Sequence, residues 1–534
     1  MTTDRPAQPR VRGNDWPGLT PPPVGEWQPS MSVSVVIPAH QAGRTLPYTL
    51  ASLAAQTYPA HLLEVVVVDD GSEPPLELPS RRPENTRVVR TEGSWGRAYA
   101  CHTGALAASG DVLHWLDADM LLHRDEVEAQ MRWHHLLDYA VVLGQKRFVD
   151  VADGLPDLDT TMAAVDRGQA GDLFADRWTS DHDWVEEHLE KTGQLTRNPT
   201  RSYLVHVGAS ASLHRSLYLD TGGMNAALKL GEDIEIGYRL AQQGAVFVPD
   251  REARSWHLGR TTLMQQQDEV NRYNRPYVTD LISDLRHWRT KGRSYSVPWV
   301  EVVVDARDRT FEEVRHSVNG ALTGSFSDVA VVLLGGWSRL DDSRRSPLGD
   351  PDRDLRMVAA EFAGDARVRF VEEVPATAFP AAFRLRLAAG WAPERESVAR
   401  LAREAAKEDR GLVSLLMPDG GVSTLERTSA FTRAERVRGP GEDLLDAVDD
   451  VSKTWWLDAA EEGFVHVDDP EASVSAPYKP EKPGRAGRGA GSRAGVTRTD
   501  DSGQTPDEQP PSDTAAGGVR RLLSRGARRG KPDA

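Results

Sequence analysis

Short apolar runs alternate with stretches of helical spacing in the first half of the chain. Residues 33–37 and 63–68 are apolar or β-branched almost throughout, which predicts strands buried on both faces. Between them, residues 45–56 carry apolar side chains at helical spacing. Three further elements are predicted at 87–90 (strand), 98–108 (helix) and 111–116 (strand). This alternation predicts a mostly parallel α/β sheet with helices on both faces.

The second half of the chain repeats this pattern from residue 298. The run 300–304 parallels the first strand, and a helical stretch and two more strands follow at 310–322, 328–334 and 367–371. We interpret this as a duplicated fold, with one domain at 31–290 and a second at 298–470. The second copy is expected to be degenerate. It has Gly335-Gly336-Trp337-Ser338 where the first has Asp69-Asp70-Gly71-Ser72, and no Asp-x-Asp follows its later strand, residues 412–417.

The two ends of the chain have a different composition. Residues 1–30 are rich in proline and residues 475–534 in Pro, Gly, Ser and Arg, so we expect a disordered leader and a disordered tail. The basic stretch 519–531 is either a solvated tail or a weak contact with anionic lipid at a membrane surface. The first residues lack the charged and apolar segments of a secretory signal, and no run is long and apolar enough to span a membrane.

Net charge narrows the class of partners. The formal charge of −16 argues against nucleic-acid binding, which needs a basic surface. It fits an enzyme that holds a cation between its carboxylates and the phosphates of a ligand. The single cysteine, Cys101, excludes an intramolecular disulfide and suits a reducing, cytoplasmic compartment.

The strongest chemical motif is Asp117-Ala118-Asp119, directly after the apolar strand 111–116. Alternation along a strand places the two carboxylates on one side, where they can share a divalent cation that also holds a diphosphate. Mg²⁺ and Mn²⁺ prefer such oxygen ligands. The alternative is a pair of solvated loop carboxylates.

Four other positions carry candidate chemistry, each with a structural alternative. Asp70 can accept a hydrogen bond from a nucleobase or serve an ordinary turn, and Arg97 can meet a phosphate, the base or solvent. Glu232 and Asp233 begin a predicted helix, so they are either general-base candidates or carboxylates that the helix dipole favours. His257 can complete the metal site or be a structural histidine.

Together these motifs resemble glycosyltransferase family 2, the inverting enzymes of GT-A fold, over residues 32–280. The motifs that carry the resemblance are Val33-Ser-Val-Val-Ile-Pro38, Val68-Asp-Asp-Gly-Ser72, Asp117-Ala-Asp119, Gly231-Glu-Asp233 and His257. The resemblance implies a GT-A catalytic domain followed by a degenerate GT-A-like one. Two departures concern the nucleobase region: His40 stands where Tyr, Phe or Asn is usual, and Ala100-Cys101-His102 replaces Ala-Arg-Asn.

Residue roles follow from the resemblance. Asp233 would be the catalytic base, with Glu232 beside it. Asp117 and Asp119 would hold Mn²⁺ or Mg²⁺ on the donor diphosphate, and His257 would complete the metal shell. The residues expected along the nucleotide-sugar are Pro38, His40, Asp70, Arg97 and Asp117.

The sequence therefore predicts a cytoplasmic, metal-dependent, inverting glycosyltransferase. Its donor would be a nucleotide-sugar, by resemblance a UDP-sugar, and its acceptor a hydroxyl group of a glycan, a lipid-linked glycan or another molecule, as in cell-wall or polysaccharide biosynthesis. Two alternatives stay open: a noncatalytic scaffold that binds nucleotide-sugars, and a nucleotidyltransferase, although the region after the first strand lacks the glycine-rich loop of that class.

Overall fold

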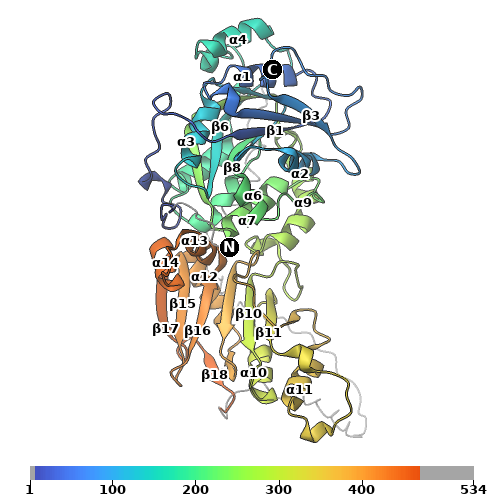
Figure 1. The fold of residues 1–534 in the computed structure, drawn as a ribbon, viewed down its shortest axis with the longest axis vertical. Helices are drawn as coiled ribbons and strands as arrows, with labels where there is room; N and C mark the ends of the chain where they lie inside the picture. The colour runs from blue at the N-terminus through green and yellow to red at the C-terminus, as the bar shows by residue number, and fades with distance from the viewer. Residues whose placement is uncertain (1–6, 469–534) are drawn as a thin grey trace, which may run out of the picture.

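The computed structural model describes residues 7–468, which form two α/β domains stacked end to end in an elongated molecule (Figure 1). The first domain contains the blue and green elements, and the second the yellow and orange ones. The predicted tail at 475–534, with its basic segment, lies outside the described residues. Among the helices of residues 7–468, none is both long and apolar enough to cross a membrane.

The first domain is built on a nine-stranded sheet. Its strands are β1 (Val33–Ala39), β2 (Leu63–Asp69), β3 (Thr86–Arg90), β4 (Val112–Leu116), β5 (Met120–Leu122), β6 (Ala140–Val149), β7 (Thr179–Asp181), β8 (Ser210–His214) and β9 (Val246–Leu258). The order is β3-β2-β1-β4-β8-β6-β9-β5, with β7 beside β6. Strands β3, β2, β1 and β4 are parallel, as the pattern predicts, whereas β8 runs antiparallel to both of its neighbours.

Helices cover both faces of this sheet because the strands are apolar on both. Along β1, Val33, Val35 and Ile37 pack with α1 (Leu46–Ala54) and α3 (Glu126–His134), whereas Val36 belongs to the core on the other face. That second core also takes side chains from α2 (Arg97–Ala107), α6 (Arg215–Asp220) and α7 (Glu232–Gln242). The remaining helices are α4 (Leu158–Asp166), α5 (Asp183–Lys191), the 3-10 helix η4 (Pro199–Val205), α8 (Thr262–Gln265) and α9 (Gln267–Leu281).

The second domain has a seven-stranded sheet and a separate strand pair. Its strands are β10 (Val300–Asp305), β11 (Val329–Leu334), β12 (Val368–Val371), β13 (Phe383–Leu387), β14 (Trp391–Pro393), β15 (Arg410–Leu416), β16 (Val422–Arg427), β17 (Lys453–Asp458) and β18 (Phe464–His466). Its helices are α10 (Phe311–Leu322), α11 (Arg353–Phe362), α12 (Ser397–Lys407), α13 (Thr428–Val437) and α14 (Leu444–Val451). The order is β12-β11-β10-β13-β16-β15-β17, and β14 pairs with β18.

Seven strands of the first sheet, β3-β2-β1-β4-β8-β6-β9, follow the same order and the same pattern of directions as the seven strands of the second sheet. In each, four parallel strands are followed by an antiparallel strand and then by a parallel pair. The shared order is what a duplicated fold predicts. It also corrects one assignment. The counterpart of β4 is β13, which the sequence pattern does not predict, and the predicted strand 412–417 falls on β15 (Arg410–Leu416), the counterpart of β6. The tripeptide in the place of Asp117-Ala118-Asp119 is therefore Ala388-Ala389-Gly390.

The expectation of a disordered leader is wrong for residues 7–30. Val11 is 3% exposed in a hydrophobic cluster that also contains residues of both domains, such as Tyr139 and Phe431. The side chain of Asn14 is buried and exchanges hydrogen bonds with the backbone of Phe247, at 2.8 and 2.9 Å. Composition does not predict this docking, because only a few side chains attach an otherwise irregular segment to the two domains.

Candidate active site

Two carboxylates and one imidazole meet where β4 ends. Asp117 and Asp119 flank the turn into β5, and His257 pairs with Met120 across the β5–β9 ladder. Backbone hydrogen bonds fix this turn: the Asp117 amide donates to Ala209, and the Asp119 carbonyl accepts from Leu258. The ligand atoms of Asp117, Asp119 and His257 all lie within 4.8 Å of one another.

The donor set fits a divalent cation. His257 is 3% exposed, and its Nδ1 lies 3.1 Å from the carbonyl oxygen of Gly259. Because a carbonyl can only accept, Nδ1 carries a hydrogen, so Nε2 is the ring atom that would bind a cation; it lies 3.6 Å from Asp119 Oδ1. Burial and the charge of Asp117 raise the pKa of Asp119, although His257 acts against them. A cation would offset both effects.

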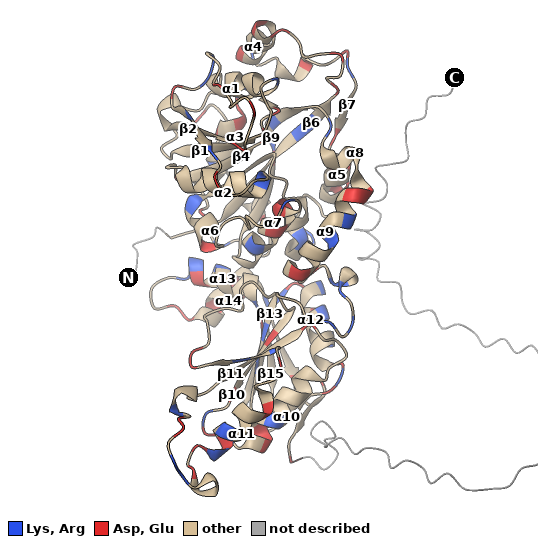
Figure 2. Cartoon of the chain, turned by 90° about the vertical axis from the view of Figure 1, so that its right-hand side faces the viewer, with Lys and Arg blue, Asp and Glu red and all other residues tan. Residues whose placement is uncertain are grey.

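Arg97 stands at the first turn of α2 among three carboxylates. Its guanidinium donates to Asp233 Oδ1 at 2.7 Å, to Asp117 Oδ1 at 3.0 Å and to Glu232 Oε1 at 3.1 Å. This network joins the Asp-x-Asp turn to the start of α7, although Asp117 and Glu232 are 115 positions apart in the sequence. Figure 2 shows acidic and basic segments next to each other at α7.

Glu232 and Asp233 begin α7, and their environments shift their pKa values in opposite directions. Burial and the neighbouring Asp233 raise the pKa of Glu232 to about 7, against the opposing charge of Arg97. Burial would also raise the pKa of Asp233, but Arg97, His206 and the amide of Gly208 together outweigh it and hold that pKa below its ordinary value. The preceding Gly231 has φ +83°, and a Cβ there would come within 2.9 Å of Val278, so glycine sets the entry to this helix.

A second group lies at the carboxyl ends of β1 and β2. Asp70 accepts a hydrogen bond from the amide of Gly96 at 2.7 Å, which connects this group to the residue before Arg97. His40 Nδ1 donates to the carbonyl oxygen of Asp70 at 3.0 Å, and Pro38 lies in β1 opposite Val68. The structure thus places Pro38, His40 and Asp70 together at the carboxyl ends of β1 and β2. The predicted metal ligands and the predicted base form a second group, whose members are joined by Arg97.

Three site residues were not predicted. A Cβ at Gly208 would lie 2.5 Å from Asp233 Oδ1 and 2.7 Å from Arg97 Nη2, so any larger residue would push these side chains out of place. His206 Nδ1 donates to the Asp233 carbonyl oxygen at 2.8 Å. Lys146 on β6 is 7% exposed, and burial lowers its pKa to about 8, against the charges of Asp117 and Asp233. Gly208 belongs to no recognisable sequence motif. The sequence also does not show toward which face of the sheet the side chain of Lys146 points.

Sequence comparison assigns the first domain to a family. Residues 34–216 match the model of "Glycosyl transferase family 2", a range that includes Asp70, Arg97 and the Asp-x-Asp turn and ends before α7. Chondroitin synthase of Escherichia coli is 24% identical over 371 residues, which are 64% of this chain and 50% of that protein. Hyaluronan synthase of Pasteurella multocida is 27% identical over 376 residues, 64% of this chain and 36% of that protein. The chain therefore spans half or less of these two relatives.

A solved structure with similarity to this chain is a mannosyltransferase from Pyrobaculum calidifontis in complex with GDP-Man and Mn²⁺. The two chains are 16% identical in sequence, and the match covers 50% of this chain and 69% of the mannosyltransferase chain, with a TM-score of 0.31. A score this low carries no argument about the site. The family match and the strand order together support the GT-A fold for the first domain.

Proposed function

We propose that this chain, whose residues 34–216 match the model of glycosyl transferase family 2, transfers a sugar from a nucleotide-sugar donor to an acceptor hydroxyl, with inversion at the anomeric carbon and with a divalent cation bound. The observation that carries the proposal is one contiguous network. It runs from the cation ligands Asp119 and Asp117 through Arg97 to Asp233. A transferase of this class needs charge stabilisation on one side of the anomeric carbon and a base on the other.

Asp233 would remove the proton from the acceptor. The low pKa that Arg97 helps to impose keeps this carboxylate ionised at neutral pH, so it can accept the proton as the acceptor oxygen forms its bond to the anomeric carbon. The bond from that carbon to the diphosphate oxygen breaks on the opposite face, and the diphosphate takes the bonding electrons. The carbonyl of Asp233 is held by His206, and Gly208 leaves room for the carboxylate and Arg97 to meet.

Asp117, Asp119 and His257 would hold Mn²⁺ or Mg²⁺. When bound, the cation supplies positive charge against the donor diphosphate and its leaving oxygens. Two carboxylates and one imidazole are donors that both ions accept, so these three side chains would hold one cation beside the donor diphosphate. Arg97 adds a fixed positive charge beside Asp117.

The nucleoside would lie toward Asp70, His40 and Pro38, at the ends of β1 and β2. By the family resemblance the base is uracil, which gives a UDP-sugar donor. A glycan hydroxyl is the acceptor that fits the relatives best, because the proteins from Escherichia coli and Pasteurella multocida are named as synthases of chondroitin and hyaluronan.

The substitution Asp233→Asn tests the proposed base. Asparagine keeps the shape but cannot take the proton, so kcat should fall by about 10²- to 10⁴-fold, while the donor Kd changes little. Asp268→Asn, at an exposed position on α9, is the matched control and should keep full activity. Turnover is measured as release of the nucleoside diphosphate, and donor binding by calorimetry.

Three outcomes would contradict parts of the proposal. Full activity in Asp233→Asn removes this residue as the base. Product with retained anomeric configuration, read by NMR, excludes the single displacement. A wild-type chain that binds UDP-sugars but turns over none of a panel of glycan acceptors favours the scaffold alternative.

A further inference from the structure

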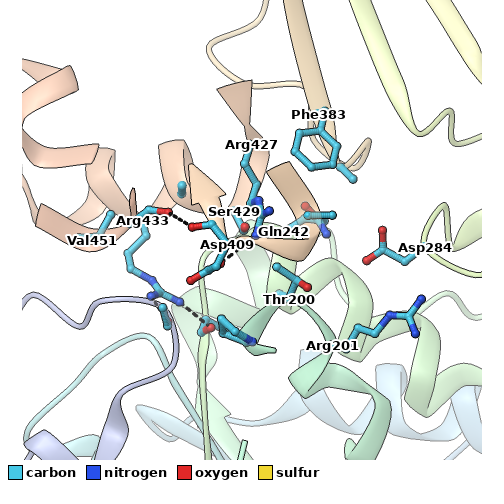
Figure 3. A pocket seen from close by; sticks show the side chains of 18 of the residues that line it. Thr200, Arg201, Gln242, Asp284, Phe383, Asp409, Arg427, Ser429, Arg433 and Val451 are labelled. Carbon is cyan, nitrogen blue, oxygen red and sulfur yellow. Dashed lines mark hydrogen bonds and ion pairs between the residues drawn. The ribbon is translucent and has the colours of Figure 1, made fainter. Parts of the chain in front are cut away.

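A cavity of about 110 Å³ lies between the two domains, away from the network around Arg97. Figure 3 shows side chains of both domains around it, Thr200 and Gln242 from the first and Phe383 and Ser429 from the second. Gly13 of the N-terminal segment also lines the cavity. Its walls therefore come from three parts of the chain that are far apart in the sequence.

The charged residues in this lining are four arginines and two aspartates: Arg201, Arg286, Arg427, Arg433, Asp284 and Asp409. Arg433 is largely used, because it donates four hydrogen bonds to carbonyl oxygens of the N-terminal segment and of Gly244 and Ala245. Asp409 is neutralised by Arg427, which donates to it at 2.9 Å. Asp284 accepts a hydrogen bond from Trp299 Nε1 at 3.2 Å. Four arginines against two aspartates give the lining a net formal charge of +2.

Three buried polar atoms around the cavity have no hydrogen-bond partner among the described residues. They are Nε of Arg427, Nη1 of Arg286 and Oε1 of Gln242. Arg427 is 4% exposed and Gln242 is 5% exposed. Each buried group left unpaired costs about 1–3 kcal/mol, so a bound polar group is the expected explanation.

Arg286 is held in place without using all of its donors. Its guanidinium carbon lies 3.8 Å from the ring centroid of Trp299 and 4.7 Å from that of Phe326. This stacking fixes the plane of the guanidinium and leaves its edge for an anion, an arrangement that suits planar, bidentate recognition of oxyanions.

The volume limits the size of the occupant. A water molecule needs on the order of 10–15 Å³ of such volume, so the cavity accommodates about seven to eleven groups of that size. A phosphate group alone, or one on a short hydroxylated carbon chain, fits this space, whereas a nucleotide-sugar does not.

We propose that this cavity is a second ligand site, which binds a small phosphate-bearing anion through Arg286 and Arg427 and takes a hydroxyl of that anion on Gln242. Gln242 is the last residue of α7, whose first two residues are Glu232 and Asp233. The occupant therefore contacts the helix that carries the candidate base and, at the same time, the second domain.

Titration calorimetry on the full chain tests this site. Inorganic phosphate and glycerol 3-phosphate are titrated separately at constant ionic strength, with EDTA present so that no cation draws phosphate to the Asp-x-Asp turn. Arg427→Met carries a risk of misfolding because Arg427 is in a buried ion pair, so the test variants are Arg286→Met and Gln242→Leu. Arg309→Met, half-exposed in the second domain, is the matched control, and Asp119→Ala reports binding at the donor site.

The expected result is saturable binding that Arg286→Met weakens at least tenfold and that the Arg309 and Asp119 variants leave unchanged. Tighter binding of glycerol 3-phosphate, with the difference lost in Gln242→Leu, would identify a phosphorylated small molecule. Equal binding of both probes would identify free phosphate. The proposal is overturned by the absence of saturable binding, by binding that Arg286→Met does not change, or by binding that Asp119→Ala abolishes. Because these readouts do not use turnover, they stand apart from the test of the glycosyl transfer.

Discussion

The sharpest prediction concerns Gly208, which the sequence did not single out. The substitution Gly208→Ala adds one carbon 2.5 Å from Asp233 Oδ1 and 2.7 Å from Arg97 Nη2. Ordinary contacts begin at 3.4 Å, so the carboxylate has to retreat by about 0.9 Å. A displacement near 1 Å at a reacting group costs about 10²-fold in rate. We therefore expect kcat to fall by about 10²-fold.

The effect should be confined to catalysis. Gly208 lies in a loop and has no positive φ, so alanine is compatible with its backbone, and the far-UV spectrum and cooperative melting should be kept. Gly364→Ala is the matched control, because nothing lies within 4 Å of a Cβ there. The assay is release of nucleoside diphosphate at saturating donor. Wild-type kcat in a folded Gly208→Ala variant would refute the view that the contact between Arg97 and Asp233 positions the base.

Three further predictions test the charge of Arg97, the burial of His188 and the docking of the N-terminal segment through Asn14. Arg97→Met removes the charge that lowers the pKa of Asp233, so the acid limb of the pH–kcat/KM profile should move to higher pH; an unmoved limb excludes Asp233 as its source. Burial lowers the pKa of His188 from 6.5 to about 4, with help from Arg201, so the folded state should lose stability as the pH drops through this interval. His188→Leu should remove at most about 3 kcal/mol of that loss. Melting curves with the same pH dependence in both proteins would contradict this linkage. Asn14→Ala leaves the backbone groups of Phe247 unpaired and should cost about 2 kcal/mol or more in urea unfolding, whereas no loss would mean that the N-terminal segment is not docked in solution.

Local sequence patterns predicted those parts of the molecule that depend on local chemistry. The strand 33–37 is readable because a strand covered on both faces needs apolar side chains at every position, and it appears as β1. Asp117 and Asp119 were predicted to share a site because residues i and i+2 of a strand point the same way. The structure places them in the turn between β4 and β5 instead, where they still lie close to each other and to His257. Their roles as ligands remain predictions.

Contacts between distant segments could not be read in the same way. The pairing of Arg97 with Asp233 and the requirement for glycine at position 208 arise only when α2, α7 and the loop before β8 converge. Asn14 looks like any polar residue in a proline-rich segment until its partner in β9 is known. The strand β13 is not a continuous apolar run like β1 and β2, because arginine alternates with apolar residues along it. Alternation suggests an outward-facing arginine, but Arg384 is buried in an ion pair with Glu301.

The most direct test of the central claim is a thermal-shift panel of UDP, GDP, dTDP and CMP, with and without Mn²⁺, on the wild-type chain and on Asp119→Ala. A ligand at about 100 times its Kd stabilises the folded state by about 2.7 kcal/mol, which is readable as a higher Tm. We predict a Mn²⁺-dependent rise with UDP that Asp119→Ala abolishes and that Asp268→Ala, on the exposed surface, retains. The absence of a shift with any nucleotide would contradict a nucleotide-sugar site at the end of β4.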